Sequence, residues 1–280
     1  MKSNYRYIVK AFMAMAVIAG TTSCDDFLDR EPMSSISPET YYSTAAQLEA
    51  NLNDEYPNVL PSFGQWTYGI FGEDKGTDNQ IEVNANDRYT QDRWKVPHSE
   101  SDNWKFERIY RINFFLSEAL PKFGEDMSGS QNTISGSVST IKHYIGEMYF
   151  LRAYEYFKKL QLFGDFPIID QPLADEMEAL REASKRFPRN EVARFIISDL
   201  DKAYAYMSDV DMATTRINKD AAMLVKSRVA LFEATWLQNS RVRHSYLVEK
   251  AGRGHLFTTI ISIRAESIDN EVKYFLEQAV

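Results

Sequence analysis

A nearly continuous apolar stretch at residues 141–163 constrains the fold of this chain more than any other feature of its sequence. When the stretch is drawn as a helix, apolar side chains occupy almost every side of it. A helix without a polar face is buried on all sides, so further helices must surround this one. The sequence Gly-Asp-Phe-Pro at 164–167 supplies the residues that end a helix. We therefore expect a multi-helix protein built around one buried helix.

Several other segments have the spacing of amphipathic helices. Apolar residues recur at i, i+3, i+7 and i+11 within residues 104–120, and Pro188 precedes a second segment of this kind. Asn218 is predicted to be the N-cap of a third helix that reaches Trp236. Shorter helices are expected at residues 33–56, where Ser37 lies near the start of a capped helix, and around residues 272–279.

These segments define the expected fold class. Strand-like alternation never extends beyond a few residues, so the class is mainly α. The helices form two pairs, at 104–163 and 190–238, which suggests stacked helical hairpins, although no 34-residue repeat is found. Two loops separate the helices, at 57–103 and 121–136. The first is far longer than usual, and loops of that length are generally functional or disordered; its many aromatic residues argue against disorder.

The first 24 residues have the features of an export signal. Lys2, Arg6 and Lys10 precede about ten apolar residues, which is typical of a secretory signal and too short to span a bilayer. Cys24 is the only cysteine, so no internal disulfide is possible. We interpret residues 1–23 as a lipoprotein signal peptide and Cys24 as the lipidated (palmitate-type) residue. The residues before Cys24 resemble the bacterial lipobox, although Thr21 stands where that motif usually has leucine. The alternative is that Cys24 is a free thiol that carries no lipid.

Composition and motifs argue against nucleic-acid binding and catalysis. The formal net charge is −8, and an acidic chain lacks the basic face that phosphates require. The four histidines include no zinc-binding pair, and neither a nucleophile elbow nor a phosphate-binding loop is present. Asp74 and Asp78 could be drawn as a glycosidase pair, but 40 acidic residues produce such pairs by chance. We expect no enzyme activity, no metal site and no cofactor.

Five blocks of sequence, in the right order, resemble the SusD/RagB family of outer-membrane nutrient-binding lipoproteins. The first is Ser-Cys-Asp-Asp-Phe-Leu-Asp at 23–29 with Pro32, and the second is Trp104 with Tyr-Arg-Ile-Asn at 110–113 and Leu116. The third and strongest is Gly-Glu-Met-Tyr-Phe-Leu-Arg-Ala-Tyr-Glu-Tyr-Phe at 146–157, followed by Leu-Phe-Gly-Asp-Phe-Pro at 162–167. The fourth is Pro-Arg at 188–189 with Asp199, Leu200 and Ala203, and the fifth is Lys-Asp-Ala-Ala at 219–222 with Lys-Ser-Arg-Val-Ala-Leu-Phe-Glu-Ala-Thr-Trp at 226–236. The resemblance covers most of residues 20–238.

The resemblance implies a SusD-like α-α superhelix of tetratricopeptide-like helix pairs with irregular loops. It also implies a non-catalytic, surface-exposed lipoprotein of the cell outer membrane. Such a protein binds oligosaccharides or other nutrients and works with a SusC-like TonB-dependent transporter. Two further readings stay open: a periplasmic helical-repeat scaffold that holds another protein, and a secreted glycoside hydrolase.

The loop at 57–103 offers the best candidates for ligand binding. Aromatic rings stack on the apolar faces of sugars, and neighbouring polar groups bind the hydroxyls. The candidate residues are Trp66, Tyr68, Asp78, Asn79, Tyr89 and Trp94. The alternative is that these aromatic rings only hold a long loop against the body of the protein.

Four other residues of the resembling blocks are expected to be structural. Arg152 and Glu147 lie on the most apolar helix, where a charge persists only when it is paired and hydrogen-bonded. A buried polar network is therefore predicted around them. Trp104 and Trp236 are predicted to lie in the core.

The chain also departs from the family pattern. Family members usually have about twice this length, so residues 24–280 are expected to be an N-terminal helical domain that is incomplete at its C-terminus. Residues 241–265 do not follow the pattern, whereas residues 267–276 resemble it again. A local reading-frame disturbance followed by truncation would produce this; a genuine short variant is the alternative.

Overall fold

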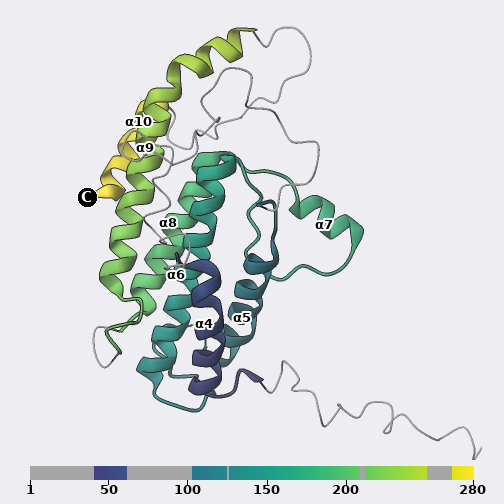
Figure 1. Ribbon diagram of the computed structural model, residues 1–280, viewed down its shortest axis with the longest axis vertical. Coiled ribbons are helices and arrows are strands. Elements are labelled where there is room, and N and C mark those ends of the chain that lie inside the picture. Colours follow the sequence, from purple (N-terminus) through teal and green to yellow (C-terminus); the bar gives the residue numbers. More distant parts are fainter. Residues whose placement is uncertain (1–40, 62–102, 125, 209–211, 251–266) are drawn as a thin grey trace, which may run out of the picture. The chain divides into compact units, whose positions relative to one another are not determined.

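The computed structural model describes residues 41–61, 103–124, 126–208, 212–250 and 267–280, with the side chains of 240–250 excepted. These residues form a mainly α-helical structure, as predicted (Figure 1). Its helices are α4 (Ala45–Val59), α5 (Glu107–Phe123), α6 (Val138–Phe163), α7 (Met177–Ala183), α8 (Arg189–Tyr206), α9 (Lys219–Lys250) and α10 (Ile268–Ala279). Within the described ranges, β-pairing is limited to two isolated bridges. No helix in this part of the chain has the length and apolarity needed to cross a bilayer.

Helix α6 is the buried helix that the sequence predicts. It packs against α4, α5 and α8, and its buried residues point in all directions around its axis. Gly146 allows the closest approach, because a Cβ atom there would lie 2.9 Å from the Ala203 carbonyl oxygen and from the Met207 backbone nitrogen of the α8 end. Gly164 ends α6 with a φ of +71°, a backbone conformation that favours glycine.

The two predicted helix pairs are present. Helix α5 packs against α6, and α8 packs against α9, while the broad contact between α6 and α8 joins the pairs. Helices α9 and α10 lie side by side (Figure 1). Pro188 precedes α8, and the Asn218 side chain accepts a 2.9 Å hydrogen bond from the Ala221 backbone N–H at the start of α9, as predicted.

Two helix boundaries were predicted wrongly. Helix α4 continues through Pro57 to Val59, and α5 continues through Pro121 to Phe123, although both prolines were expected to start loops. Val59 and Phe123 are fully buried, so packing of the last turn outweighs the hydrogen bond that each proline removes. Helix α4 begins at a capping box whose N-cap is Thr44; Ser37 lies outside the described residues.

Helix α9 continues through 241–250, part of the segment that departs from the family pattern. The rest of that segment, up to residue 265, lies outside the described residues. Helix α10 then begins at Ile268, with the Ser267 side chain as its N-cap. It buries Val272 and Phe275 as the amphipathic pattern predicts, whereas Leu276 of the same pattern is exposed.

Candidate functional site

The predicted ligand residues all lie outside the part of the chain that the structure describes. They are Trp66, Tyr68, Asp78, Asn79, Tyr89 and Trp94. The same is true of Cys24 and the signal peptide. Their roles therefore stay predictions.

The structure does show how the two ends of the segment that carries these residues are held. Lys158 of α6 donates a hydrogen bond to the carbonyl oxygen of Val59, at the end of α4. The next residue, Lys159, donates a 2.8 Å hydrogen bond to the carbonyl oxygen of Asn103. Adjacent residues of α6 thus attach both ends of the segment to the buried helix.

An aromatic cluster follows directly on that segment. The Trp104 ring contacts Phe106, Phe163 and Phe166 edge to face, with centroids 5.7, 4.8 and 4.9 Å apart. The Arg186 guanidinium lies over the Trp104 ring, 4.6 Å from its centroid. Trp104 is only partly buried, so its assignment to the core is wrong. Trp104 lies before α5 rather than on a helix face. Its partial burial comes from Phe163, the last residue of α6, and from Phe166 just after it.

Trp236 is also not a core residue. It lies on α9 and is 47% exposed, because no described helix covers this side of α9. The Arg189 guanidinium covers one face of the indole, 4.0 Å from its centroid. The Arg189 guanidinium in turn donates hydrogen bonds to the fully buried Glu233 carboxylate, from Nε at 3.0 Å and from Nη2 at 2.8 Å.

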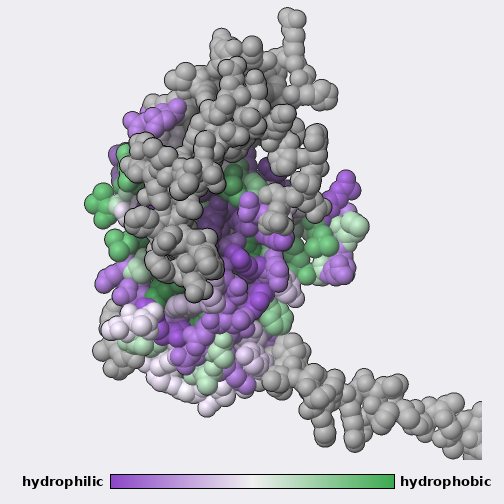
Figure 2. All heavy atoms as spheres, viewed as in Figure 1, coloured by the Kyte–Doolittle hydropathy of each residue, from purple (hydrophilic) through white to green (hydrophobic). Residues whose placement is uncertain are grey.

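The space-filling view shows where apolar side chains reach the described surface (Figure 2). Green surface appears over the α9–α10 pair and over α7, while the described surface between them is mostly hydrophilic. The exposed apolar residues of these helices include Met177, Leu180, Met223, Leu224, Leu231 and Leu276.

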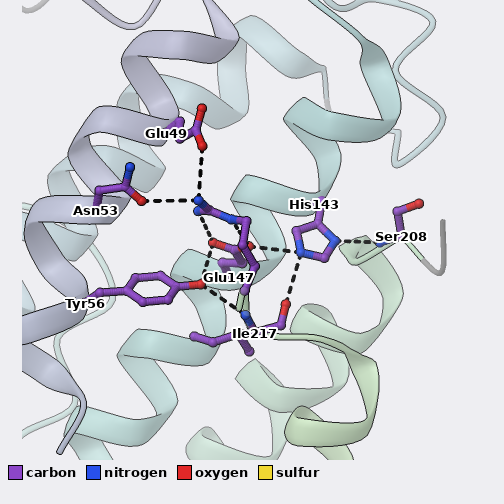
Figure 3. Close-up of polar contacts among 8 residues, drawn as sticks. Glu49, Asn53, Tyr56, His143, Glu147, Ser208 and Ile217 are labelled. Carbon is purple, nitrogen blue, oxygen red and sulfur yellow. Dashed lines mark hydrogen bonds and ion pairs between the residues drawn. The ribbon is translucent and has the colours of Figure 1, made fainter. Parts of the chain in front are cut away.

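The network predicted around Glu147 is present (Figure 3). The buried Glu147 carboxylate accepts hydrogen bonds from Arg216 at 2.7 and 2.5 Å, and from the Tyr56 hydroxyl at 2.9 Å. Arg216 also reaches Glu49 and Asn53, one turn apart on α4. Burial and the nearby Glu147 charge raise the pKa of Tyr56, so its hydroxyl stays protonated and donates. The network fastens α4 and the segment before α9 to α6.

His143 completes this network from the preceding turn of α6. Its Nδ1 accepts a 3.1 Å hydrogen bond from the Ser208 backbone N–H, so Nδ1 carries no proton. The proton therefore lies on Nε2, which faces the Ile217 carbonyl oxygen at 3.0 Å and Glu147 at 2.9 Å. This neutral tautomer satisfies every contact of the ring. A polar hollow of about 240 Å³ adjoins it, lined by His143, Ser208, Arg216 and the start of α9.

Arg152 is paired as predicted. Its Nε and Nη2 bind the two oxygens of Asp199 on α8 at 2.6 and 2.8 Å. Its Nη1 donates to the Asn113 side chain and to the Asp170 carbonyl oxygen. These hydrogen bonds go to three residues of the protein and use four of the five N–H groups of the buried guanidinium. Its role is structural.

Sequence reasoning missed the pairing of Arg189 with Glu233. The usable signal is that Glu233 lies inside an apolar block of α9, as Glu147 and Arg152 do in α6. A buried acid in such a block needs a cation. The described residues contain no group of three or more His, Cys, Asp or Glu side chains placed to hold a metal ion. What they do offer is partly exposed aromatic rings near the end of α6.

Comparison with known proteins identifies the family. A family model described as "Starch-binding associating with outer membrane" matches residues 26–231, well over half of the chain. The chain belongs to the SusD-like family. Two SusD-like relatives from Formosa agariphila, proteins P2 and P25, are 26% and 25% identical to it over 238 and 233 residues. A SusD-like protein from Bacteroides fragilis has a similar fold, with a TM-score of 0.53, 21% identity and coverage of 81% of this chain.

This SusD-like chain matches only part of each relative. The aligned regions cover 81% and 76% of the chain but 43% and 41% of the two Formosa agariphila proteins. The Bacteroides fragilis structure is covered over 42% of its length. The chain thus spans less than half the length of each of these three proteins.

Proposed function

We propose that this SusD-like chain acts as a non-catalytic, glycan-binding lipoprotein on the surface of the outer membrane. The observation that carries the proposal is the family match over residues 26–231, whose description names both starch binding and the outer membrane. The helical fold shared with a solved SusD-like protein supports it. In this proposal the chain delivers oligosaccharides or other nutrients to a SusC-like TonB-dependent transporter.

The proposed ligand site lies in the segment 57–103. Its aromatic and amide residues suit stacking on sugar rings and hydrogen bonding to hydroxyls. The candidates are Trp66, Tyr68, Asp78, Asn79, Tyr89 and Trp94. The attachment of both segment ends to α6 supports this choice, because a binding loop works best on a rigid support.

Affinity electrophoresis tests the proposal directly. The full chain in detergent is run through native gels that contain soluble starch, laminarin, xylan or pectin, with bovine albumin as the non-binding control. We expect at least one polysaccharide to retard the chain. Substitution of both Trp66 and Trp94 by alanine should remove the retardation. Absence of retardation in every gel, for a chain that circular dichroism shows to be helical, would contradict glycan binding. Release of reducing ends from the polysaccharide would instead favour the hydrolase.

A further inference from the structure

The exposed indole of Trp236 stacks on a guanidinium that is itself held by hydrogen bonds. One face of the indole rests on the guanidinium of Arg189, the first residue of α8. That guanidinium is hydrogen-bonded to Glu233, which lies one turn before Trp236 on α9. Phe232, on the preceding turn, also lies near the guanidinium, at 5.8 Å. The stacked cation therefore cannot turn away without leaving a buried carboxylate unpaired.

The support for this stack comes from the end of α6. The Arg189 backbone N–H donates a 3.0 Å hydrogen bond to the Asp165 side chain, and a Cβ atom added at Gly164 would lie 3.5 Å from the Arg189 Nη1. The next residue of the same turn, Phe166, contacts Trp104. A single turn of chain thus supports both partly exposed tryptophans.

The exposed side chain that lies one turn after Trp236 on the same side of α9 is the neutral amide Asn239. No charged side chain is exposed between residues 231 and 239. The Asn239 side-chain amide donates a 2.8 Å hydrogen bond to the Thr235 carbonyl oxygen. Apolar rings flanked by a few hydroxyl and amide groups are typical of small-molecule sites. A sugar ring fits this composition because it presents C–H groups on one face and hydroxyls at its edge.

We propose that the open face of Trp236 is a stacking surface for a sugar ring of the bound glycan, and that Arg189 and Glu233 position the indole. This rests on the proposed glycan-binding function, and it places a contact in the helical body, outside the segment 57–103. A preordered ring gains affinity because little side-chain entropy is lost on binding. Arg189 and Glu233 act through Trp236 and are positioning residues.

The test compares three substitutions at Trp236 in the affinity gels containing starch, laminarin, xylan or pectin. Trp236→Phe keeps an aromatic ring, whereas Trp236→Leu and Trp236→Ala do not. For the polysaccharide that retards the unmodified chain, we expect dissociation constants at least tenfold higher for the Leu and Ala variants and an intermediate value for Phe. Leu231→Ala is the matched control, since Leu231 is 51% exposed on the same helix, and its affinity should equal that of the unmodified chain.

The outcomes separate the two proposals. If the unmodified chain binds and the Leu and Ala variants bind equally well, the stacking role of Trp236 is wrong while glycan binding stands. Equal affinity of the Phe and Leu variants would also overturn it, because the aromatic ring would then be irrelevant. If no polysaccharide retards the unmodified chain, both proposals fail. Thermal melts of all variants check folding, and the Phe–Leu comparison decides the matter even if the Ala variant is unstable.

Discussion

At the scale of single residues, the charged side chains inside the helices have a common physical logic. Arg152 lies between the Tyr149 and Phe195 rings, at 5.3 and 5.2 Å, and places its hydrogen bonds on Asp199 and Asn113. An isolated charge at this depth is very unfavourable, whereas a paired and hydrogen-bonded one is tolerated. Removing one member of such a pair is therefore more damaging than replacing both.

We expect Arg152→Ala to lower the free energy of unfolding by roughly 3–5 kcal/mol, because it leaves the Asp199 carboxylate buried without its partner. Urea denaturation of the full chain in detergent measures this. Arg181→Ala, an exposed arginine of α7, is the control and should change stability by less than about 0.5 kcal/mol. The double substitution Arg152→Met with Asp199→Leu should recover part of the loss. Equal stability of the two single variants would refute the pairing argument.

Glu55 of α4 gives a pH-dependent prediction. Its side chain is 1% exposed, and burial raises its pKa even though Arg111 lies 2.6 Å away and opposes the shift. A carboxyl whose pKa is higher in the folded state stabilises the protein below its unfolded pKa of about 4.3, and this contribution is lost as the pH rises through the folded pKa. Glu55→Gln removes the titration.

The melting temperature of the unmodified chain, relative to Glu55→Gln, should therefore fall as the pH rises from about 4 to about 7. Differential scanning calorimetry at several pH values measures the difference. Glu182→Gln, at an exposed position of α7, serves as the control and should follow the unmodified chain. A melting-temperature difference that stays constant, or grows with pH, would contradict the raised pKa.

At the scale of elements, periodicity predicted the helices well and their ends poorly. The apolar residues of α6, the proline before α8 and the cap of α9 are local signals, and the structure confirms each of them. The ends of α4 and α5 depend on burial of Val59 and Phe123 against other helices, which no local signal contains. The same limit explains Trp236: its helix face is apolar, but exposure depends on whether another element covers it.

Helix α10 shows how one buried acid can fix an element. Glu271 is fully buried and accepts hydrogen bonds from Arg194 at 3.0 and 2.7 Å and from Asn190 at 3.1 Å. The Arg194 guanidinium also lies 3.7 Å from the Tyr274 ring centroid. These contacts, with the buried Phe275, attach α10 to α8 and α9.

We expect Glu271→Ala to detach α10, because Arg194 and Asn190 would lose the buried acceptor that they share. Amide hydrogen exchange in residues 268–279 should become at least tenfold faster, while exchange in α6 stays slow. Glu277→Ala, at an exposed position of the same helix, is the matched control. Unchanged protection of α10 in the Glu271 variant would show that apolar packing alone holds the helix.

At the scale of the whole molecule, four ion pairs between an arginine and a fully buried carboxylate connect the described elements. The pairs are Arg152–Asp199, Arg189–Glu233, Arg194–Glu271 and Arg216–Glu147. Each pair joins two different elements, so together they link α6, α8, α9 and α10, and through Glu49 also α4. Apolar surfaces alone specify register weakly, and paired charges add specificity because a shifted register would leave them unpaired.

The proposed function requires that the chain be attached to the outer membrane. In our proposal that attachment is the acylated Cys24, since the apolar stretch at 11–20 is too short to span a bilayer. We predict that cells fed a clickable palmitate analogue label the unmodified chain and that Cys24→Ala abolishes the label. Ser23→Ala, which leaves the thiol and another small residue before it, should be labelled normally. Cys24 is the only thiol in the sequence. Equal labelling of the Cys24→Ala variant and the unmodified chain, or no labelling of either, would therefore contradict acylation of Cys24.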